Sequence, residues 1–270
     1  MIVSELIPFL EELGASPRKS LSQNFLIDRN IVNKIIRTAE IVPGDSVLEI
    51  GPGPGALTTA LLEAGATVYA IEKDPLFASA LSRLQTPDHR LHVFLADALD
   101  HPLAAIPATK VVANLPYHIT TPLLERFFLH NFSSLTLMVQ KEFGQRLLAK
   151  PGSKIFSSLT LFGQFYTTPK SSFPVSSHCF YPKPSVDSSV IRLDLRTPPL
   201  HSPEPFFKLV RRAFQQRRKM LSTSLQEIYP TQQMKETLAR LGLRSDARPE
   251  MLGLDEWLLL FQKLSNEKCC

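Results

Sequence analysis

The chain has 270 residues, of which 44% are hydrophobic and 20% are charged. This composition is typical of a globular protein with a sizeable core, and it excludes an intrinsically disordered chain. The three cysteines, Cys179, Cys269 and Cys270, fit neither a disulfide framework nor the ligand spacing of a zinc site. We therefore expect no bound metal and a reducing compartment.

Secretion and membrane insertion are not expected either. Residues 1–13 are apolar with a helical period, but they contain three glutamates and lack the basic start of a signal peptide. No apolar run approaches the roughly 20 residues needed to span a bilayer. The sequence favours a cytoplasmic protein, and because nothing in it indicates an obligate interface, we expect a monomer.

The predicted elements begin with a polar loop at 20–26, which leads into a helix capped by Asp28 or Asn30. An apolar strand at 46–50 follows, and the glycine turn 51–55 then opens a second helix. Strand, glycine turn and helix begin nucleotide-binding α/β folds, because glycine lets the backbone approach a ligand and the helix N-terminus offers free N–H groups.

The spacing of this turn is Gly-x-Gly-x-Gly, with Gly51 and Gly53 separated by Pro52, and Pro54 in the second gap. Proline has no N–H, so it is unsuited to the positions at which pyrophosphate-binding loops require donors. The turn therefore favours a ligand such as an aminoacyl-nucleoside over a dinucleotide.

Two acids follow the next predicted strands. The strand at 67–71 ends at Glu72, 21 residues after Gly51, an offset at which a carboxylate accepts hydrogen bonds from ribose hydroxyls. The strand at 91–95 ends near Asp97, which we expect to accept from an adenine amino group. Either acid alone also suits an ordinary turn, but their recurrence beside the glycine turn indicates a nucleoside site.

Residues 111–117 read as a buried strand that delivers reactive groups at its carboxyl end. The Asn114 side-chain carbonyl and the Leu115 carbonyl, held outward by Pro116, would accept both hydrogens of an exocyclic amino group. Tyr117 would stack on the same base, an interaction of roughly 1–3 kcal/mol. The alternative is a strand that ends in a turn, with Tyr117 as a half-buried core ring.

Strands and helices continue to alternate after residue 117: a helix begins at Thr120 or Thr121, a strand spans 135–139, and a helix follows that contains Arg146. This alternation predicts a doubly wound parallel sheet. Residues 164–168 and 188–195 look extended and would suit an antiparallel hairpin at one sheet edge. Between them, the proline-rich loop 180–188 is either a rigid connector or a support that presents Phe180 as the second face of an aromatic sandwich.

From residue 197 the composition shifts to a linker and short helices, expected at 206–216, 218–228, 232–241 and 255–264. Residues 203–224 contain six basic side chains and one acidic one, a net charge of +5 that equals that of the whole chain. Such a localised excess indicates a polyanion partner.

Taken together, these segments resemble the small-subunit ribosomal RNA adenine N6,N6-dimethyltransferase family over nearly the whole chain. The matching segments are 22–26 (SQNFL), 49–53 (EIGPG), 114–117 (NLPY), 140–142 (QKE), 180–188 (FYPKPSVDS) and 214–219 (FQQRRK). Ser22 departs from the family, because many members have glycine at this position.

The resemblance implies an α/β fold: a Rossmann-like S-adenosylmethionine-dependent methyltransferase sheet of seven strands, followed by a small all-helical C-terminal domain. The implied domains are 1–197, with an N-terminal arm of about 28 residues, and 198–270. The implied S-adenosyl-L-methionine ligands are Asn24, Leu26, Gly51, Gly53, Glu72, Asp97 and Asn114, and the residues around the target adenine are Asn114, Leu115, Pro116, Tyr117 and Phe180.

The implied reaction moves methyl groups to N6 of two adjacent adenosines in the hairpin near the 3′ end of small-subunit rRNA, with the immature subunit as partner. The residues expected to contact RNA are Lys141, Arg146, Lys183, Arg211, Arg212, Arg217, Arg218 and Lys219. Two alternatives remain: a large-subunit rRNA methyltransferase of the antibiotic-resistance type, and a non-catalytic RNA-binding assembly or transcription factor on the same fold.

Overall fold

The computed structural model describes residues 2–18, 21–84 and 88–266, so Ser20 of the predicted loop, Cys269 and Cys270 lie outside the described residues. The chain forms two compact units. The first contains the residues up to 144 together with 168–196, and the second contains 145–167 together with the residues from 197 onward. No helix in the described ranges is long and apolar enough to cross a membrane.

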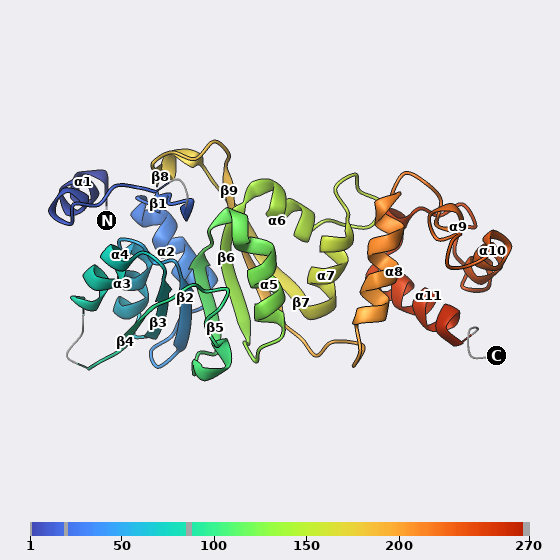
Figure 1. Ribbon diagram of the computed structural model, residues 1–270, viewed down its shortest axis with the longest axis horizontal. Helices are drawn as coiled ribbons and strands as arrows, with labels where there is room; N and C mark the ends of the chain where they lie inside the picture. The colour runs from blue at the N-terminus through green and yellow to red at the C-terminus, as the bar shows by residue number, and fades with distance from the viewer. Residues whose placement is uncertain (1, 19–20, 85–87, 267–270) are drawn as a thin grey trace. The chain divides into compact units, whose positions relative to one another are not determined.

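A seven-stranded sheet runs through the first unit in the order β4-β3-β2-β5-β6-β9-β7 (Figure 1). The strands are β2 (Ser46–Ile50), β3 (Thr67–Glu72), β4 (Leu91–Leu95), β5 (Lys110–Asn114), β6 (Ser134–Gln140), β7 (Thr167–Val175) and β9 (Ser188–Leu195). Neighbours from β4 to β6 are parallel, and β9 runs antiparallel to β6. The predicted Rossmann-like α/β sheet is confirmed.

Helices α2 and α3 cover one face of this sheet: Val32 and Leu61 share a core cluster with Val112 of β5. Asp28, one of the two predicted caps, begins α2 by accepting hydrogen bonds from Asn30 N and Ile31 N. In chain order, the helices that precede α7 are α1 (Val3–Glu12), α2 (Arg29–Thr38), α3 (Ala56–Glu63), α4 (Pro75–Ser82), α5 (Thr120–Phe128) and α6 (Lys141–Leu147).

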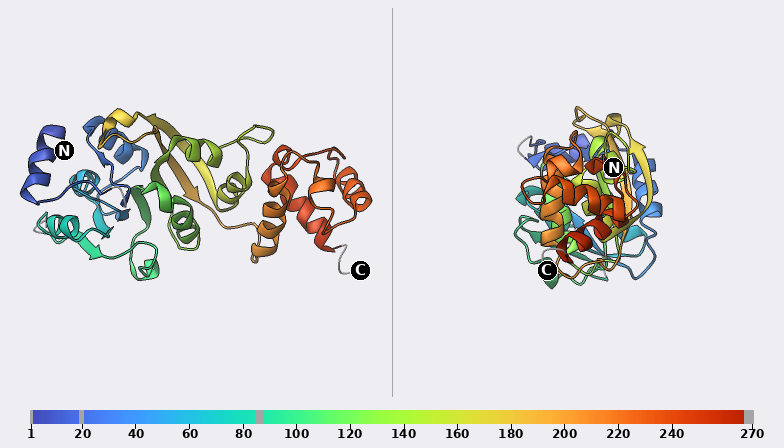
Figure 2. Two further views of the ribbon diagram at one scale, coloured as in Figure 1. Left: turned by 45° about the horizontal axis from the view of Figure 1, so that its top comes forward. Right: turned by 90° about the vertical axis from the view of Figure 1, so that its right-hand side faces the viewer.

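The second unit is helical, and Figure 2 shows α8 to α11 gathered in one group. Its helices are α7 (Ser158–Tyr166), α8 (Glu204–Gln215), α9 (Leu221–Ser224), α10 (Thr231–Arg240) and α11 (Leu254–Asn266). Three of the four predicted C-terminal helices match α8, α10 and α11 to within two residues. The fourth prediction was wrong for most of its length, because only the four residues of α9 are helical within 218–228.

One expectation about the middle of the chain needs correction. Only the last two of residues 164–168 are extended, at the start of β7: α7 continues to Tyr166 because Leu161 and Phe165, at helical spacing, are both buried. For the domain division we expected one boundary at residue 197. A unit boundary does fall there, but residues 145–167, which we assigned to the first domain, belong to the second unit.

A two-stranded sheet joins the N-terminal arm to the proline-rich loop. β1 (Phe25–Leu26) pairs antiparallel with β8 (Phe180–Tyr181), so that Leu26 lies opposite Phe180. Because side chains alternate along a strand, one residue of each strand faces each side of this ribbon. Leu26 and Phe180 belong to the main core cluster, whereas Phe25 and Tyr181 pack in a second cluster with Leu6 of α1.

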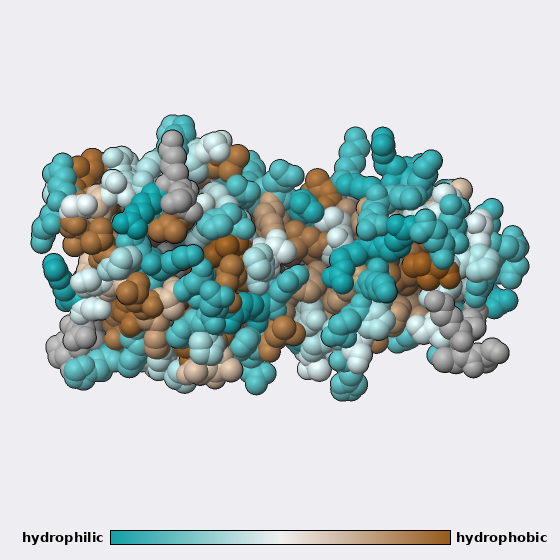
Figure 3. Space-filling model, viewed as in Figure 1, coloured by the Kyte–Doolittle hydropathy of each residue, from teal (hydrophilic) through white to brown (hydrophobic). Residues whose placement is uncertain are grey.

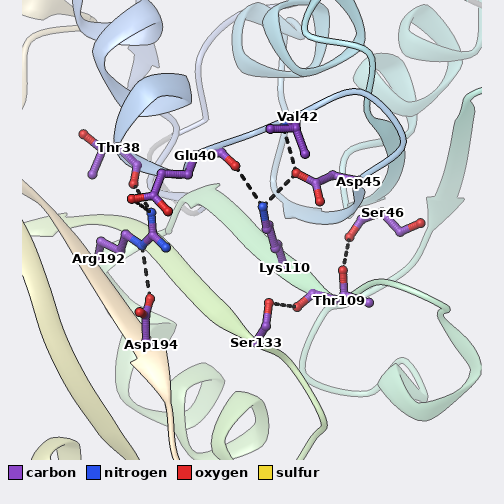
Figure 4. A network of polar contacts seen from close by, with 10 residues as sticks. All are labelled: Thr38, Glu40, Val42, Asp45, Ser46, Thr109, Lys110, Ser133, Arg192 and Asp194. Atoms are coloured by element: carbon purple, nitrogen blue, oxygen red, sulfur yellow. Dashed lines mark hydrogen bonds and ion pairs between the residues drawn. The ribbon is translucent and has the colours of Figure 1, made fainter.

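The amino-terminal edge of the sheet is fixed by a polar network (Figure 4). Arg192, which is 8% exposed, donates to the Thr38 carbonyl and forms ion pairs with Glu40 and Asp194 at 2.8 and 3.1 Å. Lys110, at the start of β5, pairs with Asp45 at 2.7 Å. These contacts tie α2, β5 and β9 together at the edge opposite the carboxyl ends of the parallel strands.

Replacing Arg192 by alanine should lower the free energy of unfolding by about 1.5–3 kcal/mol, because it removes charge-assisted hydrogen bonds from a nearly buried site. The matched control is Lys170→Ala, which removes an exposed pair with the same Asp194 at 3.8 Å and should change stability by no more than about 0.5 kcal/mol. Urea denaturation measures both, and equal effects of the two variants would contradict a structural role for the Arg192 network.

Candidate active site

A cavity of about 270 Å³ lies at the carboxyl ends of β2, β3 and β5 and beside the turn that follows β4. Small-molecule sites in proteins commonly occupy this edge of a doubly wound sheet and begin at roughly this size. All the residues predicted to contact the cofactor line the cavity, namely Asn24, Leu26, Gly51, Gly53, Glu72, Asp97 and Asn114. Leu115, Pro116 and Tyr117 line it as well.

The glycine turn between β2 and α3 approaches the cavity closely. Gly51 and Gly53 have φ values of 62° and 53°, in the left-handed region that favours glycine. A Cβ on Gly53 would lie 3.1 Å from the Phe25 ring, so the space that a side chain would need is already filled. Gly51 N donates to the Ile71 carbonyl at 2.9 Å, which fixes the turn against β3.

Glu72 holds the far side of the turn at the end of β3. Its two carboxylate oxygens accept from Gly53 N at 2.9 Å and from Asp74 N at 2.8 Å. The side chain is buried, and this burial raises the pKa of Glu72 although the hydrogen bonds from the backbone lower it. A carboxylate offers about four lone-pair directions, so acceptor capacity remains for ribose hydroxyls. That role stays a prediction.

Asp97, in the turn after β4, is charged and firmly held. It accepts from Lys73 Nζ at 2.6 Å and from Leu99 N at 2.8 Å. The hydrogen bond from Lys73 lowers the pKa of Asp97 below its usual value. Asp97 is therefore an ionised acceptor on the cavity wall, as its predicted role toward an adenine amino group requires.

Glu49 is a site residue that the sequence reasoning did not single out, although an acid within the apolar strand 46–50 is the signal that could have found it. It lines the cavity, is 1% exposed and accepts from Thr58 Oγ1 at 2.7 Å. Burial raises the pKa of Glu49 to about 8. Since a nearby cation favours the ionised form, this acidic wall suits a positively charged ligand.

Glu49 should make stability depend on pH. Below about pH 4.5 its carboxyl is protonated in both states; between that value and about pH 8 only the unfolded chain ionises, so the free energy of unfolding falls as the pH rises. Glu49→Gln should flatten this part of the profile and be more stable than the wild type above pH 8. Urea denaturation of the ligand-free protein across this range measures the effect, and parallel profiles would contradict the assignment.

Asn114, the last residue of β5, is oriented by the N-terminal arm. Its Nδ2 donates to the Asn24 carbonyl at 3.2 Å, which leaves Oδ1 available as an acceptor. The following turn uses the Pro116 carbonyl, which accepts from Ile119 N at 3.2 Å, and not the carbonyl of Leu115. Both acceptors that the sequence predicted for an exocyclic amino group therefore remain available.

Tyr117 lines the same cavity and is half-buried. Its hydroxyl lies 2.6 Å from Ser188 Oγ at the start of β9, which fixes the direction of the ring. Burial raises the pKa of Tyr117, so the phenol stays neutral. Ser188, the last residue of the motif 180–188, therefore orients Tyr117, a role that the sequence did not predict.

The N-terminal arm forms one wall of the cavity. Gln23 Nε2 donates to Asp74 at 3.1 Å, and Ser22 Oγ lies 3.0 Å from His118 Nδ1. Ser22 has a φ of 52°, which explains why glycine suits this position in many family members. Ser22, Gln23, Lys73 and His118 also line the cavity, and none of them was predicted to do so.

Phe180 is the one predicted residue of the catalytic set that does not line the cavity, and its role beside the target adenine stays a prediction. It is 3% exposed and packs in the core cluster beside Leu26 and Val190. The physical reason is its pairing with β1: the alternation along β8 turns Phe180 inward. Of the two aromatic rings that were predicted to enclose the base, Tyr117 lines the cavity.

The predicted RNA-contacting residues divide between the two units. Lys141 and Lys183 belong to the first, and both are exposed. In the second unit, Arg212 donates a hydrogen bond to the Glu227 carboxylate, and Arg217 donates one to the Lys154 carbonyl. The others there are Arg146, which is half-buried, and Arg211, Arg218 and Lys219, which are exposed. Figure 3 shows hydrophilic residues over much of the C-terminal helical region.

The mixed seven-stranded sheet, the glycine turn and the acids after β3 and β4 define a Rossmann-like S-adenosylmethionine-dependent methyltransferase. A family model described as "Ribosomal RNA adenine dimethylase" matches residues 14–266. The chain therefore belongs to the ribosomal RNA adenine dimethylase family, as the sequence resemblance predicted.

Individual relatives agree with this assignment. The chain is 46% identical to "Ribosomal RNA small subunit methyltransferase A" of Protochlamydia amoebophila, over 97% of this chain and 96% of the relative. It is 44% identical to the protein of that name in Chlamydia muridarum, over 98% of each.

Among solved structures, the chain resembles a dimethyladenosine transferase from Plasmodium falciparum, with a TM-score of 0.79, 26% identity, and 90% and 98% coverage of the two chains. It also resembles the 23S rRNA methyltransferase ErmE, with a TM-score of 0.72, 28% identity, and 90% and 100% coverage.

Proposed function

We propose that this protein transfers methyl groups from S-adenosyl-L-methionine to N6 of two adjacent adenosines in the 3′-terminal hairpin of small-subunit ribosomal RNA. The observation that carries the proposal is the pair of free acceptors at Asn114 and Leu115 on the wall of an acidic cavity. Its RNA partner would be the immature small subunit, and we further propose a cytoplasmic monomer.

The cavity suits the cofactor chemically. S-adenosyl-L-methionine, when bound, supplies a methyl group on a positively charged sulfur, which is already a strong electrophile. Glu72 would accept hydrogen bonds from its ribose, and Asp97 from its adenine. Because Gly51 and Gly53 have no side chains, the cofactor could approach the backbone of the turn. The buried carboxyl of Glu49 would gain a favourable charge interaction when a cation enters.

The task that remains for the protein is to position the target adenine. The N6 lone pair of adenine is delocalised into the ring, so the amine is a weak nucleophile. Acceptors at Asn114 Oδ1 and the Leu115 carbonyl would hold both N6 hydrogens and favour a more tetrahedral nitrogen. Tyr117, fixed by Ser188, would stack on a base that has left its helix, a step that costs a few kcal/mol and less in a loop.

The test is transfer of labelled methyl groups from the cofactor to separated ribosomal subunits that lack these modifications. We expect label in the small subunit, at two neighbouring adenosines near the 3′ end of its RNA, as N6,N6-dimethyladenosine. Label confined to the large-subunit RNA would favour the second candidate, which rests on the similarity to ErmE. Absence of transfer to both would overturn the proposal.

A further inference from the structure

An arginine outside the candidate cofactor cavity holds one of its walls. Residues 96–99, in the turn after β4, line the cavity, and this is the wall predicted to face the adenine. Arg126, on α5, is not among the lining residues. Its guanidinium donates to the Ala98 and His101 carbonyls at 2.8 and 2.5 Å, and to the Leu99 carbonyl. One side chain thus binds three carbonyl groups of this turn.

The conformation of the turn explains why its carbonyl groups need this donor. Asp97 Oδ1 accepts from Leu99 N at 2.8 Å. The Asp97 carbonyl accepts from Asp100 N and His101 N at 3.1 and 3.0 Å. The N–H groups of the turn are therefore used on Asp97, and the carbonyl groups that follow need donors from elsewhere. A guanidinium suits them because it presents five N–H donors in one rigid plane.

Arg126 is carried by a firmly packed helix. Its neighbours on α5, Leu123, Leu124 and Phe127, are fully buried. The helix follows directly after the 3-10 turn Tyr117–Ile119, which lines the cavity. Because a close-packed helix keeps a fixed position, the guanidinium gives the turn after β4 a firm point of attachment. Arg126 therefore ties the wall that carries Asp97 to the helix that follows Tyr117.

We propose that Arg126 is a positioning residue for the cofactor: it fixes the turn after β4 so that Asp97 accepts a hydrogen bond from the adenine amino group. This role rests on the contact given to Asp97 under the proposed function. Lys73 Nζ contacts the Asp97 carboxylate directly at 2.6 Å, whereas Arg126 acts on the backbone of the turn. Without Arg126, three carbonyl groups lose their donor, and the turn shifts to expose them to water. Asp97 then no longer meets the amino group, and the cavity loses its preference for adenine.

The test compares two ligands that differ in one group. They are S-adenosyl-L-homocysteine, which is the cofactor without its transferable methyl group, and its 6-deamino analogue, in which hydrogen replaces the amino group of the base. Isothermal titration calorimetry of the full-length protein should show that the wild type binds the amino compound about 10–100-fold more tightly, because only this compound donates to Asp97.

Arg126→Met should reduce this preference to about threefold or less, by weakening the binding of the amino compound alone. Arg126→Lys keeps the charge but not the planar fork, so it should lose about threefold of the preference. The lysine variant decides the question if Arg126→Met does not fold. Equal weakening of both ligands would overturn the proposal.

A double-mutant cycle shows whether Arg126 acts through Asp97. In the Asp97→Ala protein, which lacks the acceptor, both ligands should bind with similar affinity. Adding Arg126→Met to that protein should change neither affinity by more than about threefold. If Arg126→Met weakens the binding of the amino compound by the same factor with and without Asp97, the proposal is overturned.

The matched control is Arg90→Met. Arg90 is half-buried like Arg126, and it donates to the Leu62 and Ala66 carbonyls at 2.8 and 3.2 Å, outside the cavity. Both variants should melt at a lower temperature than the wild type, and only Arg126→Met should alter the ligand preference. A loss of stability without a change of preference in Arg126→Met would make Arg126 a structural tie and overturn the proposal.

Methyl transfer to small-subunit RNA, measured on the same samples, separates this proposal from the proposed function. A wild type that methylates the RNA, together with an Arg126→Met variant that keeps the full preference, contradicts the role of Arg126 alone. A wild type that does not methylate the RNA, but whose preference for the amino compound depends on Arg126 and Asp97, contradicts the proposed function alone.

Discussion

Replacing Asn114 by alanine should lower kcat for methyl transfer by about 10²–10³-fold. Removing one hydrogen-bonding group that acts at the reacting atom has an effect of this size in other enzymes. The Asn114 side chain reaches the cavity from the end of β5, and its Oδ1 is the acceptor left available for the N6 amine. Single-turnover measurements with labelled cofactor give the rate of the chemical step.

The controls for this experiment separate chemistry from folding and cofactor binding. Asn33→Ala, at an exposed position of α2, should leave kcat unchanged. The Asn114→Ala protein should melt within a few degrees of the wild type and bind cofactor with less than about a tenfold loss, because Gly51, Glu72 and Asp97 remain in place. A kcat within tenfold of the wild-type value would contradict the role given to Asn114.

Replacing Glu72 by alanine should raise the dissociation constant for S-adenosylmethionine at least 100-fold. The change removes the proposed ribose acceptor and leaves the N–H groups of Gly53 and Asp74 without their partner. Hydrogen bonds to a charged group contribute roughly 1.5–3 kcal/mol each, so the loss of the two proposed bonds from the ribose hydroxyls accounts for this factor. Isothermal titration calorimetry measures the constant directly.

The control for Glu72 is Glu63→Ala, at the exposed end of α3. It removes one carboxylate from the same unit without touching the cavity, and it should leave cofactor affinity within threefold of the wild type. If Glu72→Ala also stays within that range, the cofactor does not depend on this corner of the sheet.

Local patterns in the sequence were sufficient to predict the cavity. The strand that ends at Glu72 and the strand that ends at Asn114 are short apolar runs bounded by turn residues, and parallel strands bring their carboxyl ends to one edge. The prolines in the glycine turn correctly disfavoured a pyrophosphate loop. In each case the information lies within a few residues of the predicted group.

The burial of Phe180 could not be predicted, because it depends on a contact between distant segments. The face to which its ring points is set by the pairing of β8 with β1, whose residues are more than 150 positions earlier in the chain. A shift of one residue in that register would turn Phe180 to the other side. Nothing in the local motif 180–188 specifies this pairing.

Segment 145–167 shows a similar limit. The rest of its unit, from residue 197 onward, follows 30 residues later in the chain. Glu49 was overlooked for a different reason: the acid within an apolar strand was a visible signal, but its hydrogen bond with Thr58 and its charge interaction with Glu72 depend on the fold.

The most direct test of the account is a crystal structure of the protein with S-adenosylmethionine and adenosine. We predict that the donor lies beside Gly51, with its ribose at Glu72 and its methyl group directed toward an adenosine whose N6 is within hydrogen-bonding distance of Asn114 Oδ1. A donor bound elsewhere, or an adenosine whose amino group faces away from Asn114 and Leu115, would contradict the central claim.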